Sequence, residues 1–313
     1  MSQYILRRLG GMVAVMFIVA TIVFLIAHVI PGDPAAVMLG SDATAADVDA
    51  LRHRLGLDAP LPLQYVDFMR SVVQLKLGES IFLNRTVTQA LAERAMLTTQ
   101  LTVMSAMIAI LLGVPIGVLS AVKRGSTLDQ SVTALSMTAA SLPSFWVGLT
   151  LIEYFAVHWR ILPVAGYGPP GAGFFEHLRY LVLPAIAVGI PNSALIIRFT
   201  RTSMLDVLHE DYVRTARAKG LAPGTVIIKH AFRNARTSVL TVIGLTVAGL
   251  VGGAIVTETV FALPGVGNLV VSAVLRRDYP VIQGALLVIS GLYVLINLGV
   301  DLLYAVLDPR VRY

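Results

Sequence analysis

The residue types that carry out most protein chemistry are scarce in this sequence of 313 residues, which has 18 Asp and Glu, six His and no Cys. Without cysteine, disulfides, thiolate metal sites and a cysteine nucleophile are excluded. His209 and Glu210 begin as a zinc-protease motif does, but Val213 stands where the second histidine is needed. No Gly-x-Ser-x-Gly nucleophile elbow and no Gly-x-x-x-x-Gly-Lys-Ser/Thr phosphate loop occurs. The sequence therefore predicts no catalytic, cofactor-binding or metal site.

Glu153 and Asp301 are the acidic residues nearest to the interiors of long apolar segments. Ionisable groups inside a membrane are costly and often mark ion or proton paths. Both residues lie within about two turns of a segment end, so their carboxylates could also reach the membrane interface. Two isolated carboxylates are a thin basis for a proton relay, and we favour the interfacial placement.

The elements that would position these residues are membrane-spanning helices. With 56% hydrophobic residues, 13% charged residues and a mean hydropathy of +0.79, the chain has about half the charge of a soluble domain. A bilayer core of about 30 Å requires about 20 apolar helical residues. Six segments meet this requirement, at residues 9–30, 101–122, 132–157, 180–199, 239–256 and 281–303. We therefore predict an all-α polytopic membrane protein with six transmembrane helices.

Lysine and arginine are distributed unequally between the two sides of these segments. With the N-terminus inside, the inner connections and termini hold 14 of the 24 Lys and Arg, and the short outer connections hold four. Positive residues accumulate in short loops on the cytoplasmic side, whereas long translocated segments escape this rule. Both termini are therefore predicted to be cytoplasmic. The net charge of +6 then reflects membrane topology and not nucleic-acid binding.

Two connections are too long to be simple turns. The outer one, 32–95, is predicted to contain short helices, because Thr44 and Asp47 have the spacing of a helix cap and Gly56 would end that helix. A second short helix is expected at about 63–75. We interpret the whole chain, 1–313, as one transmembrane domain without a separate linker, made of an anchor helix (1–31), an extracytoplasmic segment (32–95), a core (96–306) and a cytoplasmic tail (307–313).

The inner connection at 200–237 is the most basic part of the chain. Its sequence predicts a helical stretch, a Gly/Pro break at 220–224 and a second helical stretch. The first helix would have an apolar side and a basic side, formed by Tyr212, Ala216 and Leu221 and by Arg214, Arg217 and Lys219. Two interpretations stay open: the helix inserts into a groove on a soluble partner, or it lies on anionic lipid headgroups.

Four prolines interrupt the predicted helical pattern, at Pro115, Pro143, Pro184 and Pro191. Each proline removes one backbone hydrogen bond, which membrane helices tolerate where neighbours satisfy the freed carbonyl group. Pro184 and Pro191 lie on nearly the same face of one helix, seven residues apart. A bent helix of this kind could line or gate a pathway, whereas a static packing kink is the interpretation that we favour.

Short motifs with a fixed order and spacing extend over nearly the whole chain. They are Tyr4-Ile5-Leu6-Arg7-Arg8-Leu9, Pro31-Gly32-Asp33-Pro34, Leu77-Gly78-Glu79-Ser80, Gly113-Val114-Pro115-Ile116-Gly117, Leu142-Pro143-Ser144-Phe145-Trp146, Leu162-Pro163-Val164-Ala165-Gly166-Tyr167, the segment from Glu258 to Phe261, Pro264-Gly265-Val266-Gly267 and Asp308-Pro309-Arg310-Val311-Arg312-Tyr313. Together they resemble the permease subunit of an ABC importer of the dipeptide, oligopeptide and nickel class, in its first-permease, dipeptide-permease-B-like type.

This resemblance implies a mechanism and a set of partners. A second permease subunit, two ABC ATPase subunits, an extracytoplasmic substrate-binding protein, a peptide-like substrate and membrane lipid are expected, and nucleic acid is not. The ATPase subunits would bind and hydrolyse ATP with Mg²⁺, so this chain would carry no cofactor and would not be an enzyme. Residues 96–306 would be the permease core, in the inner membrane of a bacterium.

The resemblance also assigns roles to residues. The inner connection would be the coupling loop, and contact with the ATPase would come from Glu210, Asp211, Tyr212, Arg214, Thr215, Ala216, Lys219, Gly220 and Leu221. In the wider family this loop carries a Glu-Ala-Ala-x-x-x-Gly signature. Aligned on Gly220, only Ala216 and the glycine survive, and Arg214 replaces the glutamate, so Glu210 and Asp211 could supply the acidic contacts. The expected pathway or gating residues are Pro143, Pro184, Pro191 and Glu258.

Other functions remain as alternatives. A nickel-chelate or glutathione importer permease of the same family would share these motifs. A gradient-driven carrier acting alone would give Glu153 and Asp301 a clearer purpose. An intramembrane enzyme would need a catalytic constellation, and the sequence contains none that we recognise.

Overall fold

The computed structural model describes residues 2–29, 34–40, 43–54, 56–80, 82–169, 171 and 173–307. The Pro31-Gly32-Asp33 part of one motif, the motif at 308–313 and the tail beyond Leu307 lie outside the described residues. The helices, with two π-helical segments η1 and η2, are α1 (Ser2–Val29), α2 (Pro34–Leu39), α3 (Ala45–Arg54), α4 (Leu61–Val73), α5 (Val87–Val122), α6 (Thr127–Ser141), α7 (Ser144–Leu151), η1 (Ile152–His158), α8 (Phe174–Leu208), α9 (Asp211–Ala218), α10 (Pro223–Thr225), η2 (Val226–Phe232), α11 (Arg233–Val260), α12 (Val266–Arg276) and α13 (Tyr279–Leu307).

Five helical stretches of the described chain are long and apolar enough to cross a membrane. They are Arg7–Ile26, Val87–Val122, Phe174–Leu208, Pro223–Val260 and Tyr279–Leu302. A sixth crossing exists if the pair Thr127–Ser141 and Ser144–His158, bent by 98°, counts as one span. The all-helical membrane fold with five to six spans is therefore confirmed. Glu153 lies exposed within η1.

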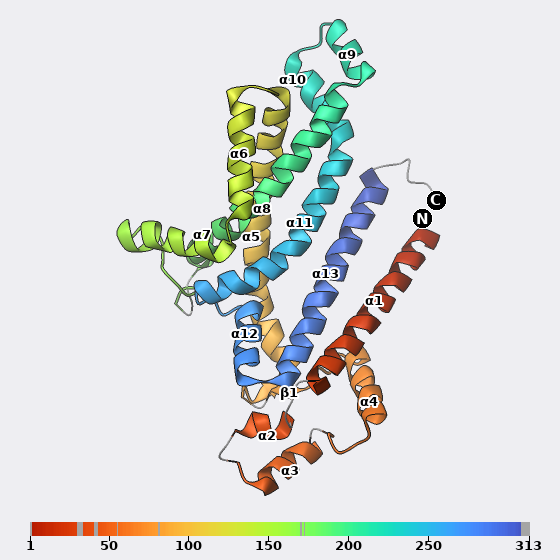
Figure 1. The fold of residues 1–313 in the computed structure, drawn as a ribbon, viewed down its shortest axis with the longest axis vertical. Coiled ribbons are helices and arrows are strands. Elements are labelled where there is room, and N and C mark those ends of the chain that lie inside the picture. The colour runs from red at the N-terminus through yellow and green to blue at the C-terminus, as the bar shows by residue number, and fades with distance from the viewer. Residues whose placement is uncertain are drawn as a thin grey trace. The chain divides into compact units, whose positions relative to one another are not determined.

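The third predicted segment, 132–157, is not one straight helix. Figure 1 shows α7 turning away from the direction of α6. Pro143 lies at the break, where it precedes the first residue of α7, and Leu142 before it is extended with ψ of 124°. A residue before proline disfavours helical geometry, and the proline itself has no N–H to donate. By contrast, Pro115 lies inside the continuous helix α5, and Pro184 and Pro191 lie inside α8.

By its internal contacts the described chain forms two compact units, Met1–Met96 with Gly265–Leu295 and Leu97–Pro264 with Ile296–Tyr313. In the first unit, α3 begins as expected: the Thr44 hydroxyl and amide both donate to the Asp47 carboxylate, at 2.5 and 3.2 Å. These hydrogen bonds hold the pKa of Asp47 below its usual value. The predicted helix at 63–75 is α4.

The first unit contains a buried hydrogen bond near its two-residue strands β1 (Glu79–Ser80) and β2 (Arg85–Thr86), which pair antiparallel. The buried Ser80 hydroxyl donates to the Asp278 carboxylate, which is also buried. Gly284 lies against this region, where a Cβ atom would meet the Val87 side chain at 2.5 Å. The start of α13 therefore packs directly on the start of α5.

Small residues let α5 and α8 approach closely in the second unit. A Cβ atom on Gly113 would meet the Ile196 side chain at 2.6 Å, and one on Gly117 would meet Thr200 at 2.7 Å. In return, a Cβ on Gly189 of α8 would meet Ile108 of α5 at 2.9 Å. Such contacts between small residues are the usual basis of tight helix packing in membranes.

The buried Asp129 carboxylate joins three helices of the second unit. It accepts hydrogen bonds from Arg201 Nε at 2.7 Å and Nη2 at 2.9 Å, in the bidentate geometry that is strongest for this pair. The Ser120 hydroxyl and the Gly125 amide supply two more donors, at 2.5 and 2.9 Å. Only 4% of Asp129, which lies on α6, is exposed, and the protein donors to its carboxylate come from α5, α8 and the α5–α6 turn.

Replacing this carboxylate should weaken the second unit. We expect Asp129→Ala to lower the thermal midpoint of the detergent-solubilised protein, because Arg201 and Ser120 lose a charged acceptor, with a cost of about 1.5–3 kcal/mol. Thermal denaturation monitored by intrinsic fluorescence measures the change. Ser120→Ala, which removes a single donor, is the control and should cost less. A midpoint for Asp129→Ala equal to that of the unmodified protein would contradict this role.

Candidate functional site

The basic inner connection protrudes at one end of α8 and α11, and we call its residues 207–226 the elbow. Figure 1 shows α9 and α10 together at that end, as the predicted order of helix, break and helix requires. Glu210 is the N-cap of α9, with extended geometry at φ −68° and ψ 146°. Its carbonyl group accepts the Val213 and Arg214 amides at 3.0 and 3.2 Å, which starts the helix directly after the end of α8.

Gly220 ends the helix and turns the chain. Its φ is +75°, the left-handed conformation that glycine adopts without a steric penalty. The Lys219 amide donates to the Thr215 carbonyl group at 3.0 Å, and the Gly220 amide donates to that of Arg217 at 2.9 Å. Pro223 then begins α10, where a missing N–H costs nothing. The break therefore follows from local sequence.

One face of α9 is buried against the rest of the elbow. Val213 is 0% and Ala216 5% exposed, and both pack with Val226 against Val207 and Leu208. Residues three apart share a helix face, so the Val213 and Ala216 side chains together hold α9 in place, and we call this pair the anchor of α9. Val213 was not predicted as a packing residue, although its apolar i, i+3 spacing to Ala216 is visible in the sequence.

The expectation that Tyr212, Ala216 and Leu221 share one side of a helix is wrong for Leu221, whereas Tyr212 and Ala216 are four residues apart within α9. Tyr212 and Leu221 are each 40% exposed, whereas Ala216 is buried. Leu221 lies beyond the helix end, after the left-handed Gly220, so helical periodicity does not apply to it. The Tyr212 hydroxyl accepts a hydrogen bond from Asn234 Nδ2 at 2.7 Å, although 40% of the residue stays exposed.

The outer face of α9 carries charges that are free to meet another molecule. Arg214, Arg217 and Lys219 are exposed, as predicted from the sequence. The Arg214 guanidinium lies 3.5 Å from the Asp211 carboxylate, but both side chains are so exposed that this ion pair contributes little. Thr215 is exposed too and donates its hydroxyl to the Asp211 carbonyl group at 2.9 Å. Thus the elbow presents cations beside the half-exposed Tyr212 and Leu221.

A cavity of about 350 Å³ lies beside α9 within the second unit. It is lined by Val122, Leu208, Arg217, Leu221, Pro223, Val226 and Ile227. The lining is apolar except for the Arg217 side chain, so the cavity suits an apolar side chain inserted from outside the unit.

The expected pathway residues occupy three different settings. Glu258 in α11 is 0% exposed, and its Oε1 accepts the Thr98 hydroxyl at 2.6 Å. Pro184 is buried in α8, and Pro191, seven residues further along the same helix, is half-buried. Pro143 is exposed at the bend before α7, so the structure does not bring it into the core with the others. Within the described ranges, no group of three His, Asp or Glu residues could hold a metal ion.

Comparison with known proteins places these features in a family context. Residues 113–313 match the model of the binding-protein-dependent transport system inner membrane component, and residues 1–102 match the model of the corresponding N-terminal region. The chain is 45% identical to a probable peptide ABC transporter permease of Sinorhizobium fredii, over the full length of both. It is 41% identical to the dipeptide transport system permease of Escherichia coli K12, over 100% of this chain and 99% of that protein.

A solved structure supports the fold independently. The chain resembles a chain of the inward-facing methionine ABC transporter with a TM-score of 0.60 and 18% identity, over 70% of this chain and 97% of that one. At this level of identity the likeness concerns the fold alone.

The buried anchor of α9 generates a direct test. We expect Val213→Asp to detach α9, because a charge would replace a fully buried side chain, and trypsin should then cut at the α9 cations about tenfold faster or more. Limited proteolysis of the purified protein with mass spectrometry of the fragments measures the rate. Thr215→Asp, which adds the same charge to the exposed face, should leave the rate unchanged. Equal rates for the two variants would refute the anchor.

Proposed function

The chain belongs to the family of binding-protein-dependent transport system inner membrane components, and from this membership we propose that it conducts peptides into the cell as one of two permeases driven by partner ATPases. Family membership confirms the expected multi-pass inner-membrane location and the non-catalytic nature of the subunit. It also implies ATPase and binding-protein partners. The second permease, the pairing of two ATPase subunits and the peptide cargo are parts of the proposal.

The exposed elbow is the observation that carries this proposal. A short helix that is held in place by its own buried residues, Val213 and Ala216, can transmit a displacement without unfolding. Its outer face offers Arg214, Arg217 and Lys219 to acidic groups and Tyr212 and Leu221 to an apolar groove. A helix seated in a groove on a soluble partner uses this combination. We therefore assign residues 210–221 to the contact with the ATPase.

The lipid-surface interpretation of the elbow is the competing one. A helix that lies on headgroups buries a broad apolar face in the membrane and keeps its cations beside the phosphates. In α9 the apolar face is already covered by Val226, Val207 and Leu208 of the same unit. The acidic Glu210 and Asp211 at the start of the helix would also be repelled by anionic lipid. Both points favour the protein partner.

The remaining assignments follow from the topology. Residues 1–31 would anchor the chain, 32–95 would meet the binding protein on the outside, and 96–306 would form the translocation core, with 307–313 in the cytoplasm. Pro184 and Pro191 in α8 and the buried Glu258 in α11 would line or gate the pathway, with Pro143 at the bend. ATP and Mg²⁺ would be bound by the ATPase subunits. Relatives named for peptides and a dipeptide support a peptide cargo, with glutathione or a nickel chelate as the alternative.

Reconstituted transport tests the proposal as a whole. The chain, co-purified with its permease and ATPase partners, is placed in proteoliposomes with the binding protein and a radiolabelled dipeptide. Uptake should require ATP and the binding protein together. Uptake by this chain alone, driven by a proton gradient without ATP, would reject the proposal in favour of a gradient-driven carrier.

The apolar contacts of the elbow should decide ATPase association. We expect the double variant Tyr212→Ala and Leu221→Ala to weaken the co-purification of ATPase subunits about tenfold or more, because a few central contacts, often made by tyrosine, carry most of the energy of an interface. Quantitative immunoblotting of the purified complex measures the loss. Val73→Ala, at a highly exposed aliphatic residue of α4, is the control. Undiminished ATPase recovery with the double variant would contradict the assigned contact.

Glu258 allows a separate test of the pathway. Glu258→Gln keeps the side-chain volume and an acceptor for the Thr98 hydroxyl but replaces the carboxyl group of the proposed pathway residue with an amide. We expect initial uptake in proteoliposomes to fall about tenfold, with subunit assembly unchanged. Glu153→Gln, at an exposed carboxylate, should transport normally. Uptake by Glu258→Gln at the unmodified rate would assign Glu258 to packing alone.

A further inference from the structure

Helix α4 of the first unit leaves several large apolar side chains exposed. Five aliphatic residues within it and just after its end have between 56% and 84% of their surface exposed: Leu61, Leu63, Val66, Val73 and Leu75. Exposed apolar side chains that gather on one short helix mark contact with a membrane or with another protein. The proposed function gives segment 32–95 as a whole to the binding protein and does not say what covers α4.

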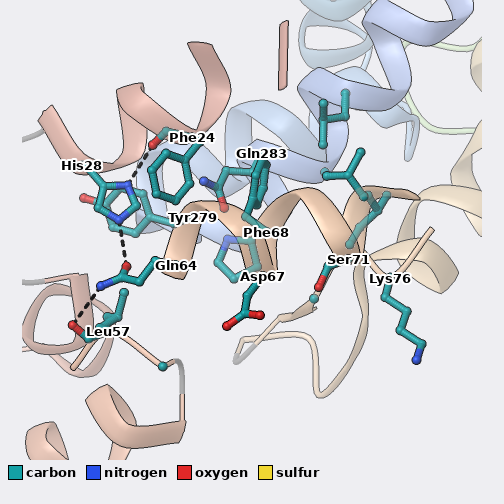
Figure 2. A pocket seen from close by; sticks show the side chains of 17 residues that line it. Phe24, His28, Leu57, Gln64, Asp67, Phe68, Ser71, Lys76, Tyr279 and Gln283 are labelled. Atoms are coloured by element: carbon teal, nitrogen blue, oxygen red, sulfur yellow. Dashed lines mark hydrogen bonds between the residues drawn. The ribbon is translucent and has the colours of Figure 1, made fainter. Parts of the chain in front are cut away.

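The contacts of α4 place it beside the membrane-spanning part of α1. The hydroxyl groups of Tyr65 and Thr21 are hydrogen-bonded at 2.8 Å. The ring centres of Phe68 and Phe24 lie 5.5 Å apart, and Figure 2 shows the two rings between α4 and α1. Thr21 and Phe24 both belong to the apolar span Arg7–Ile26. The first two turns of α4 therefore lie at the depth of this span and not beyond its end.

The contacts continue inward along α4. Met69 and Val72 pack on the buried cluster that contains Ala20. With the N-terminus inside, Ile26 is the outer end of the span, and Ala20 precedes it by six residues, which is about 9 Å at 1.5 Å per helical residue. Amphipathic helices at a membrane surface bury their apolar side about 5–10 Å into the boundary between headgroups and acyl chains. Helix α4 lies at this depth.

The two flanks of α4, on either side of the face that packs on α1, differ in polarity. Val66 and Val73 are seven residues apart, which is two helical turns, so they share one flank. Asp67 and Ser71 lie on the other flank, where they and Gln64 line a cavity of about 300 Å³ between α4, the end of α1 and the start of α13 (Figure 2). Because the Asp67 side chain is exposed, this second flank meets water.

Lipid is the neighbour that this depth favours for the apolar flank. The same span of α1 has exposed aliphatic side chains that face the bilayer, namely Ile18, Ile22 and Leu25. Val66 follows Tyr65, and Val73 follows Val72, so the two valines lie at the depth of these lipid-facing residues. A water-soluble binding protein docks above the membrane surface and does not reach the hydrocarbon core.

A second permease is the other candidate neighbour, and the position of Arg70 argues against it. Arg70 comes two residues after Phe68, which packs on α1, so it lies on the far side of α4, and it is exposed. In lipid, its long apolar stem lets the guanidinium reach the phosphate headgroups. A protein neighbour would take the same charge out of water, which is costly without an acidic partner.

We infer that α4 is an interfacial helix whose Val66 and Val73 flank is covered by lipid of the outer leaflet, while its Asp67 and Ser71 flank faces water. Helix α4 then supports the outer end of α1 within the membrane, and the rest of segment 32–95 stays available to the binding protein. The inference rests on the multi-pass membrane location of the chain. It does not depend on the proposed peptide cargo or on the contact with the ATPase.

Single introduced cysteines test this inference cleanly, because the chain contains no cysteine of its own. Val66→Cys, Val73→Cys and Asp67→Cys are each labelled with a bimane fluorophore in the purified full-length chain, which is then placed in nanodiscs. Quenching is measured with phosphatidylcholine that carries a doxyl group near its headgroup end, and with iodide in the water. We expect the doxyl lipid to quench the labels at Val66 and Val73 about threefold more than the label at Asp67, and iodide to give the reverse order.

A label at Leu25, on the exposed side of α1, is the control for insertion and should be quenched by the doxyl lipid. Equal lipid quenching at the three α4 positions, or stronger iodide quenching at Val73 than at Asp67, would overturn the inference. The labelled chain is measured again after the second permease and the ATPases, and then the binding protein, are added. Loss of the lipid quenching at either step would assign the flank to that protein and would also overturn the inference. Because no transport is measured, failure of the ATP-driven proposal leaves these outcomes unaffected.

Discussion

The ion pair and hydrogen bonds of the buried Asp129 carboxylate are the interactions on which the second unit depends. A buried ion pair costs desolvation energy unless its geometry is good and the remaining lone pairs are satisfied. Here Arg201 binds in bidentate fashion, and Ser120 and Gly125 supply the other donors. Since α8 continues from Arg201 to the elbow at α9, the proposed coupling would pass a displacement of the elbow to α6 and α5 through this pair. The proposed coupling needs such a rigid link.

What could be predicted from the sequence depends on the range of the interaction. The Thr44–Asp47 cap and the end of α9 at Gly220 are local and were found. The Asp129–Arg201 pair joins residues 72 positions apart, and no local pattern contains it. Prolines show the same limit. Pro143 lies at a helix break while Pro184 lies inside α8, and the residue type alone does not distinguish the two.

The candidate site was predicted in outline and not in its packing. Composition and the order of short motifs were enough to identify the elbow and the permease class. The buried face of α9 was misplaced, because a side containing Leu221 assumes that the helix continues past Gly220. Val213 was overlooked, because a single valine between charged residues gives a weak periodic signal until the partner Val226 is known. Tertiary packing supplied that information.

Charge is rare in this chain, so the way each charged group is used carries information. Asp129 and Arg201 neutralise each other and hold helices together. Asp67 and Lys76, by contrast, are exposed to solvent, so their charges need no partner within the protein.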